Sequence, residues 1–258
     1  MKKAKDLYKR YKIPLWTVVG IVGVFLLWWL ISVLLKTSLF PTPWVVLPEF
    51  FKLFALKSTY LAVGGTLLRL IASIAAGMIL GLLLGVISGL NESFRAYIRP
   101  LIVIFKTVPT AAVIYILIVL VSPNYAPIII VFLMAFPIIY EAIVTGMTSI
   151  DPNIIDASSM DGARTIQKVF RIYIPLSSNY ILLGFVSSIG LGMKVAIMSE
   201  VLTGNASADG IGKLIRNAAL TVDMTLIMAY SLIAIIIIGL IDIAIHFVKK
   251  RLKNNIKK

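Results

Sequence analysis

Six long apolar runs constrain this sequence more than any other feature, because each is long enough to cross a membrane as a helix. The runs cover residues 14–35, 65–90, 101–121, 125–147, 179–202 and 224–246. About 20 apolar residues suffice for a helix to span roughly 30 Å of hydrocarbon. The backbone must satisfy its own hydrogen bonds there, and the alternating ten-residue segments of a β-barrel are missing. The sequence therefore predicts an all-α polytopic membrane protein with six transmembrane helices.

Composition excludes a soluble enzyme and most metal chemistry. Hydrophobic residues make up 60% of the chain and charged residues 14%, whereas about 25% of a soluble domain is charged. The absence of cysteine rules out a disulfide framework and thiol catalysis. A single histidine, His246, leaves almost no nitrogen ligands for a transition metal. We therefore expect no metal and no cofactor.

The net charge of +14 predicts the orientation of the chain. Seventeen of the 25 lysines and arginines fall in the two terminal tails and in the segments 91–100 and 163–173, which share one side of a six-span protein. Four lie on the other side: Lys52, Lys57, Lys213 and Arg216. Because cations favour the cytoplasmic side, we expect cytoplasmic tails at 1–13 and 249–258, around a multi-pass protein of the cytoplasmic (inner) membrane. Cations at the edges of a bilayer predict no nucleic-acid partner.

The first run should be retained as a transmembrane helix over residues 14–36. It carries no charge between Pro14 and Leu35, and no small-x-small cleavage site follows it.

Glycines recur every four residues in the second run, at Gly77, Gly81, Gly85 and Gly89. Such a ladder lets another helix approach closely. Two interpretations stay open, namely tight packing within the chain and a subunit interface or sliding surface. The fifth run repeats the pattern with Gly184, Ser188, Gly192 and Ala196.

Charged residues within the runs are candidates for function, because they are costly in hydrocarbon. Arg69 and Lys106 lie near the ends of their runs, so we expect their side chains to snorkel. Lys194 and Glu200 lie deeper and, at six residues apart, point roughly 240° from each other around one helix. Each needs another partner, so a role in a translocation path and a buried ion pair with another span both stay open.

The segment 148–178 on the predicted cytoplasmic side is rich in local signals. Asp151 followed by Pro152 is typical of a helix start, and the helix should end near Gly162. A second short helix is predicted over 163–170. Apolar side chains between the charges predict a docking surface for another protein, with an amphipathic segment lying on the membrane as the alternative. These side chains are Ile154, Ile155, Met160, Val169 and Phe170.

This segment resembles the EAA loop of binding-protein-dependent ABC transporter permeases. Asp156-Ala157-Ser158 matches the EAA block, Gly162 the glycine, and Ile172-Tyr173-Ile174-Pro175 the closing block, with the same spacing. Three mild substitutions depart from the pattern: Asp for Glu, Ser for Ala and Ile for Leu.

Further blocks are similar to the nitrate, sulfonate and taurine branch of these permeases, and the resemblance covers about residues 40–248. Met193 stands where the branch often has tryptophan. The blocks are Phe40–Pro43, Thr66–Arg69, Val108-Pro109, Glu200–Leu202 and Gly210–Gly212.

The resemblance implies a type I ABC importer permease (MetI-like) fold, with residues 57–248 as its transmembrane domain. The segment 148–178 would form coupling helices that dock on a separate ABC ATP-binding subunit, and Gly162 would permit close approach of the two short helices. The implied coupling residues are Asp156, Ala157, Ser158, Gly162, Ala163, Val169, Phe170, Ile172 and Pro175.

The resemblance also implies a path, a solute and further partners. Arg69, Lys194 and Glu200 are the candidate path residues, and the two cations would suit a small anion such as a sulfonate or nitrate. A second permease would complete the path, either another copy of this chain or a related permease, and we expect a homodimer. An extracytoplasmic solute-binding protein would dock on the outer loops 37–60 and 203–223.

Other function classes carry less support from the residues. No phosphate-binding loop and no catalytic motif is present, so we expect no enzyme, and ATP hydrolysis would belong to the partner. The main alternative is an ion-coupled secondary transporter or channel that uses Lys194, Glu200 and Glu141. A non-transporting assembly subunit is the third class.

Overall fold

The computed structural model describes residues 2–37, 39–204 and 209–255, and the side chains of residues 2–14, 245, 246 and 248–255 lie outside the description. The tail cations and His246 therefore fall outside the described side chains. Over the described residues the structure is helical, without a β-strand. Its elements are α1 (Lys2–Leu35), α2 (Pro43–Leu53), α3 (Lys57–Leu90), α4 (Glu92–Thr107), α5 (Thr110–Leu120), α6 (Ala126–Thr148), α7 (Pro152–Met160), α8 (Thr165–Lys168), the π-helix η1 (Val169–Tyr173), α9 (Ile174–Thr203), α10 (Ile211–Leu220) and α11 (Met224–Asn255).

Five of the six predicted spans are continuous apolar helices long enough to cross a membrane. The third prediction was wrong as a single helix over 101–121. Its residues belong to α4 and α5, which meet at a bend of 96°. Val108 precedes Pro109, and a residue before proline is pushed out of the helical region, which agrees with the extended backbone of Val108 (φ −66°, ψ 132°).

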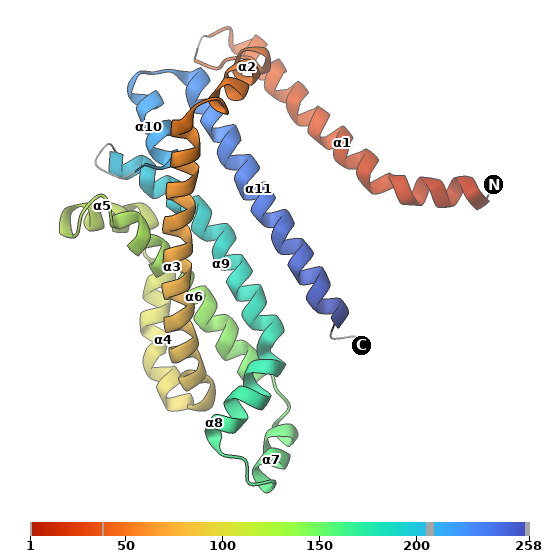
Figure 1. The fold of residues 1–258 in the computed structure, drawn as a ribbon, viewed down its shortest axis with the longest axis vertical. Helices are drawn as coiled ribbons and strands as arrows, with labels where there is room; N and C mark the ends of the chain where they lie inside the picture. Colours follow the sequence, from red (N-terminus) through yellow and green to blue (C-terminus); the bar gives the residue numbers. More distant parts are fainter. Residues whose placement is uncertain (1, 38, 205–208, 256–258) are drawn as a thin grey trace.

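The glycine ladder of α3 packs within the chain, against α6. A Cβ atom added at Gly81 would lie 2.8 Å from Cγ2 of Ile139, and one at Gly85 would lie 3.0 Å from Cβ of Ile143. From the other side, glycines of α9 approach α6 and α3 just as closely, because a Cβ at Gly192 would lie 3.2 Å from Cγ1 of Val131. Helices α3, α6 and α9 therefore form the core through close backbone approach (Figure 1).

Two short helices, α2 and α10, lie at one end of the molecule, in the loops that the sequence placed outside (Figure 1). Pro43 opens α2 after the extended Thr42. Its apolar face, with Val46, Phe50 and Leu53, packs against the first half of α11. Helices α7 and α8 lie at the opposite end of the molecule. The fold therefore separates the predicted outer loops from the predicted cytoplasmic segment.

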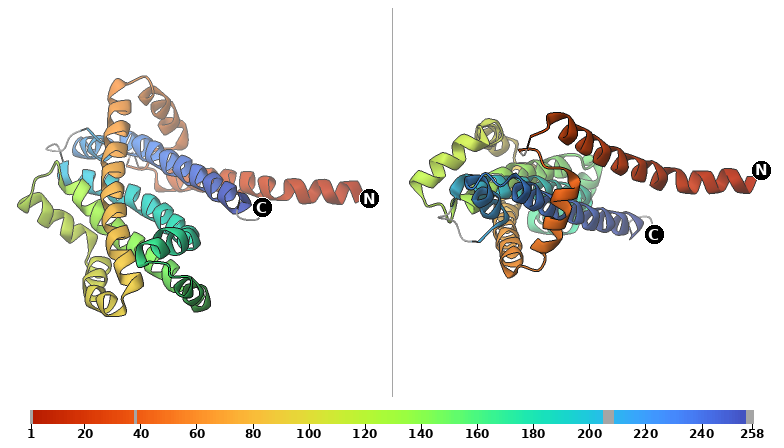
Figure 2. Two further views of the ribbon diagram at one scale, coloured as in Figure 1. Left: turned by 60° about the horizontal axis from the view of Figure 1, so that its bottom comes forward. Right: turned by 90° about the horizontal axis from the view of Figure 1, so that it is seen from above.

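Helix α1 projects away from the rest of the chain (Figures 1 and 2). Two hydrogen bonds tie its end to the following segment: Trp28 Nε1 donates to the carbonyl of Pro41 (3.1 Å), and Ser32 Oγ donates to that of Phe40 (2.7 Å). Only 6% of the apolar stretch within Leu15–Leu35 is buried inside the chain. Most of its apolar surface is therefore available to lipid or to another protein chain.

Candidate functional site

The segment between α6 and α9 begins as the sequence predicts. The Asp151 carboxylate accepts a hydrogen bond of 2.9 Å from the backbone N–H of Asn153, and Pro152 occupies the first position of α7. This cap satisfies one of the free N–H groups at the start of the helix. The predicted start of the first short helix is therefore confirmed.

Gly162 ends α7 with a left-handed backbone conformation, at φ +73°. Its N–H donates to the Ser159 carbonyl, and the N–H of Ala163 donates to the Ser158 carbonyl, both at 3.1 Å. A Cβ atom at Gly162 would meet no atom of this chain within 4 Å. The described chain thus shows no close approach of two helices at Gly162, contrary to expectation, and the positive φ is what favours glycine here.

The second short helix is α8, and it does not end at 170 as predicted. It continues through η1 into α9, so residues 165–203 form one helical run. Val169 is buried, whereas the exposed fractions of Phe170 and Met160 are 68% and 88%. An apolar cavity of about 430 Å³ lies between α8 and the end of α3. The end of the molecule that carries α7 and α8 therefore presents large apolar side chains on the surface of the chain.

The other candidate coupling residues divide by exposure. Asp156, Ala157 and Pro175 are exposed, while Ser158, Ala163 and Ile172 are half-buried.

A buried cluster of charged groups joins α3, α9 and α10. Nη2 of Arg69 lies 2.7 Å from Oε1 of Glu200, and Nε of Arg69 donates to the same oxygen at 3.1 Å. Glu200 is fully buried, and 8% of Arg69 is exposed. The expectation that Arg69 snorkels was therefore wrong. Of the two roles left open for Glu200, the structure shows the buried ion pair with another span.

The same carboxylate holds the start of α10. Oε2 of Glu200 accepts hydrogen bonds from Thr66 Oγ1 (2.9 Å) and from the N–H of Gly212 (3.0 Å). The N–H of Ile211 donates to Thr66 Oγ1 at 3.0 Å, and Nη2 of Arg69 donates to the carbonyl of Asp209 at 2.6 Å. A carboxylate at a helix N-terminus is favoured by the free N–H groups and the helix dipole. Three of the sequence blocks, 66–69, 200–202 and 210–212, thus meet in one cluster.

Glycines make this cluster possible. A Cβ atom at Gly210 would collide with the Arg69 guanidinium and the Glu200 carboxylate, and one at Gly212 with the backbone of α9. A Cβ at Gly65 would collide with the Asp209 carbonyl. The sequence signal for the cluster was present as glycines and charges in separate blocks, but pairing across 131 residues could not be predicted from spacing.

The remaining charges in the spans do not join this cluster. Lys106 lies 2.8 Å from both carboxylate oxygens of Glu141 on α6, so its charge has a protein partner, contrary to the expectation of snorkelling alone. Lys194 is exposed and forms no ion pair with a described residue. Both acids named for an ion-coupled path therefore have separate cationic partners, and Lys194 pairs with neither of them.

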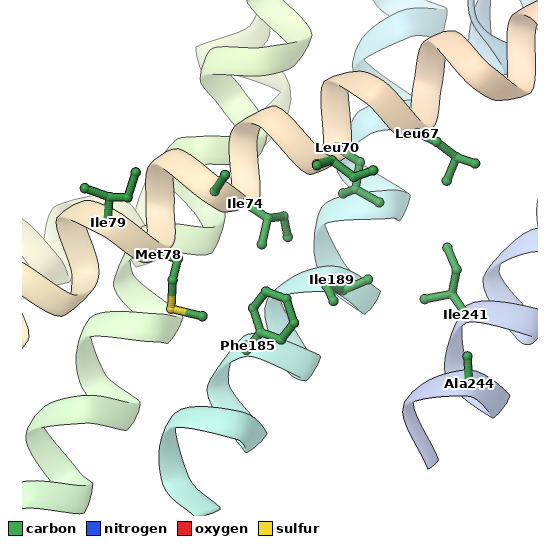
Figure 3. A pocket seen from close by; sticks show the side chains of 11 residues that line it. Leu67, Leu70, Ile74, Met78, Ile79, Phe185, Ile189, Ile241 and Ala244 are labelled. Carbon is green, nitrogen blue, oxygen red and sulfur yellow. The ribbon is translucent and has the colours of Figure 1, made fainter. Parts of the chain in front are cut away.

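An apolar groove of about 610 Å³ lies between α3, α9 and α11 (Figure 3). Leu70 and Ile74 of α3 face Phe185 and Ile189 of α9, and Ile241 lines the side formed by α11. Its lining residues are all apolar, so this groove offers a small anion no charged or hydrogen-bonding side chain.

Most of the chain is similar in sequence to known proteins. Residues 77–258 match the family described as the binding-protein-dependent transport system inner membrane component. A probable ABC transporter permease protein from Brucella melitensis is 28% identical over 176 residues, which are 68% of this chain and 70% of the relative. The taurine transport system permease protein TauC from Escherichia coli is 22% identical over 243 residues, or 91% of this chain and 87% of TauC.

Solved structures show the same fold. A chain of the inward-facing MetNI methionine ABC transporter superimposes with a TM-score of 0.65 at 19% identity, covering 74% of this chain and 94% of its own. A chain of a bacterial ABC transporter involved in the import of alginate gives a TM-score of 0.67 at 17% identity, covering 97% of this chain and 99% of its own. The fold is that of a MetI-like ABC importer permease. The chain belongs to the family of inner membrane components of binding-protein-dependent transport systems.

Proposed function

We propose that this chain forms the transmembrane path of an ATP-driven importer and couples to a separate ATP-binding subunit through residues 148–178. The observation that carries this proposal is the exposed end formed by α7 and α8. Met160, Ile166 and Phe170 are all more than half exposed there. Covering apolar surface is favourable by roughly 25 cal/mol per Å², so these side chains would stabilise a docked partner.

The charges agree with a cytoplasmic ATPase as this partner. Arg164, Lys168 and Arg171 all lie in this segment, on the side that the cation bias assigns to the cytoplasm. The exposed Asp156 is available to a basic side chain of the partner. ATP-driven closure of two ATPase subunits would move α7 and α8, and α8 continues through η1 into the core helix α9. Movement at the docking end would thus be transmitted directly into the membrane.

A second copy of the chain and a solute-binding protein complete the proposed importer. Helix α1 is apolar and projects from the body, which supports packing on another permease, and a homodimer is the simplest assembly. At the other end, α2 and α10 occupy the loops that would receive an extracytoplasmic solute-binding protein.

The solute that we propose is a small molecule with an anionic group, such as nitrate or a sulfonate like taurine. The name of TauC supports this class, and the chain resembles TauC over most of its length. Because Arg69 is neutralised by Glu200, the exposed Lys194 is the better candidate of the two cations for attracting an anion.

A single-cysteine experiment tests the coupling. The chain has no cysteine, so Met160→Cys introduces its only thiol, at a side chain that is 88% exposed. A cleavable thiol-reactive photo-cross-linker at this position in intact membranes should capture a subunit that carries the phosphate-binding loop of an ATPase. Ser93→Cys, on the exposed first turn of α4, is the matched control and should capture much less. Equal capture at both positions, or none at Met160→Cys, would contradict the proposal.

A further inference from the structure

Helix α4 carries cations on the face that it turns toward α6. Arg95 and Arg99 are four residues apart and Lys106 follows seven residues later, which places all three on the same side of a helix. Both arginines line a cavity of about 380 Å³ between α4 and α6. The lining residues are Arg95, Arg99, Ile102, Val103, Tyr140, Glu141, Val144 and Thr145.

The charges around this cavity do not balance. Lys106 neutralises Glu141, since its ammonium lies 2.8 Å from both carboxylate oxygens. The partner of Arg95 is Glu92, at 3.5 Å, and the Glu92 side chain is 89% exposed to the solvent. Arg99 forms no ion pair with any described residue. The cavity therefore keeps an excess of positive charge, with one guanidinium lacking a counter-charge.

The cavity lies toward the predicted cytoplasmic end of α4 and α6. Arg99 is seven residues, or about 10 Å, from the start of α4, and Glu141 is equally far from the end of α6. Both of these helix ends lie on the predicted cytoplasmic side. Arg95 is half-buried and Arg99 is exposed, so a solute or a lipid headgroup can reach both guanidinium groups. Two arginines beside one cavity, with an excess of positive charge, favour an anion as its occupant.

We propose that Arg95 and Arg99 bind an oxyanion, a phosphate, sulfonate or carboxylate group, in the cavity between α4 and α6. The planar guanidinium presents paired N–H donors that match two oxygens of such a group. Ile102, Val103 and Val144 line the same cavity, so they would contact a short aliphatic portion of the ligand. This site is separate from the Arg69–Glu200 cluster and from the coupling segment, and it does not depend on ATPase docking.

Two sources can supply this group. One is the headgroup of an anionic phospholipid in the cytoplasmic leaflet, which basic pockets between transmembrane helices attract. The other is a small soluble anion that enters from the cytoplasm or from the transport path. The recognition chemistry is the same for both.

The test uses the purified full chain in detergent with two probes, phosphatidylglycerol and ethanesulfonate. Native mass spectrometry measures lipid retention, and calorimetry measures ethanesulfonate binding. At least one probe should bind the wild-type chain. Arg99→Gln should weaken that binding about tenfold, which corresponds to the loss of one charge-assisted contact of roughly 1.4 kcal/mol. Arg95→Gln should weaken it as well.

Arg171→Gln is the matched control, because Arg171 is an exposed cation of the same predicted side outside the cavity. It should leave binding unchanged. Arg99→Lys keeps the positive charge but loses the paired N–H donors of the guanidinium, so it should bind with intermediate affinity. Circular dichroism of the helical signal checks that each variant is folded.

The two probes also distinguish a lipid headgroup from a soluble anion as the source of the bound group. Phosphatidylglycerol that stays bound in excess ethanesulfonate assigns the site to a lipid headgroup. Displacement by ethanesulfonate assigns it to a soluble anion. The proposal is overturned if neither probe binds, or if Arg99→Gln and Arg171→Gln weaken binding equally.

Discussion

Arg69 of α3 and Glu200 of α9 form a buried ion pair, with 2.7 Å between Nη2 and Oε1, although 131 residues separate them in the sequence. The pair also reaches the backbone at the start of α10, through Asp209 and Gly212. A fully buried carboxylate with four hydrogen bonds is satisfied by the protein. The geometry therefore favours a role in holding three helices together over direct contact with a solute.

Removing one partner of this pair should be strongly destabilising. Glu200→Gln leaves the Arg69 guanidinium buried without a counter-charge, and we expect a loss of about 3–5 kcal/mol in unfolding free energy. Denaturant unfolding in detergent measures this loss. Glu49→Gln is the control, because Glu49 pairs with Lys52 on the surface, and it should cost less than about 1 kcal/mol. A loss for Glu200→Gln as small as that of the control would contradict this role.

Adjacent glycines at the outer part of α3 provide a sharper comparison. A Cβ atom at Gly65 would collide with the carbonyl of Asp209, whereas one at Gly64 would meet nothing within 4 Å. Gly65→Ala should therefore displace the start of α10 and cost about 1–3 kcal/mol, while Gly64→Ala should be neutral or slightly stabilising in its helix. Thermal unfolding of the two variants measures the difference. Equal melting temperatures would show that the contact between α3 and the start of α10 is not made.

The glycine ladder predicts that α3 tolerates a large side chain on its exposed face but not at a glycine that packs against α6. Gly81→Leu would force α3 away from Ile139 of α6, where even a Cβ atom would approach to 2.8 Å. We expect loss of most folded protein, because overpacking a tight helix contact costs at least about 1–3 kcal/mol. Ala76→Leu places the same bulk on the exposed face of α3 and should fold normally. Size-exclusion profiles of the two variants decide the matter, and normal folding of Gly81→Leu would argue against this packing.

The orientation predicted from the cations can be tested with two single cysteines. Trp44 on α2 and Met160 on α7 are both more than two-thirds exposed and lie at opposite ends of the molecule. A membrane-impermeant maleimide added to intact cells should label Trp44→Cys only. In inside-out vesicles it should label Met160→Cys only. The reverse pattern would place the termini outside and remove α7 from the side where ATP is available.

The sequence predicted the elements better than the contacts between them. Asp151 and Pro152 carry a local signal that suffices to place the start of α7. The apolar runs predicted five of the spans correctly, because a helix that crosses the membrane needs an apolar run of that length. The break between α4 and α5 was missed because residues 101–121 are long enough for one span, although Pro109 marked the break. Helices α2 and α10 were missed because they lie in the outer loops, where the thickness of the membrane sets no expected helix length.

The ion pairs show why contacts at the candidate site were harder to predict from the sequence than the helices were. Arg69 and Glu200, and likewise Lys106 and Glu141, come from different helices. Periodicity reveals which residues share one helix face, but it does not show which helices meet. Gly162 was expected near the end of the first short helix, but the positive φ that favours glycine there is visible only in the structure.

Coupling through residues 148–178, where Gly162 shapes the end of α7, is the central claim, and ATP-driven uptake into proteoliposomes tests it most directly. The liposomes hold the permease, its ATPase subunit and the solute-loaded binding protein. Gly162→Val places a β-branched residue at φ +73°, which costs about 1–2 kcal/mol or more. Asparagine adopts this left-handed conformation more readily, so Gly162→Asn should cost less. We expect the valine variant to insert normally and lose at least about tenfold in uptake, while the asparagine variant retains most of it. Wild-type uptake by the valine variant, or uptake by the chain alone under an ion gradient, would contradict the account.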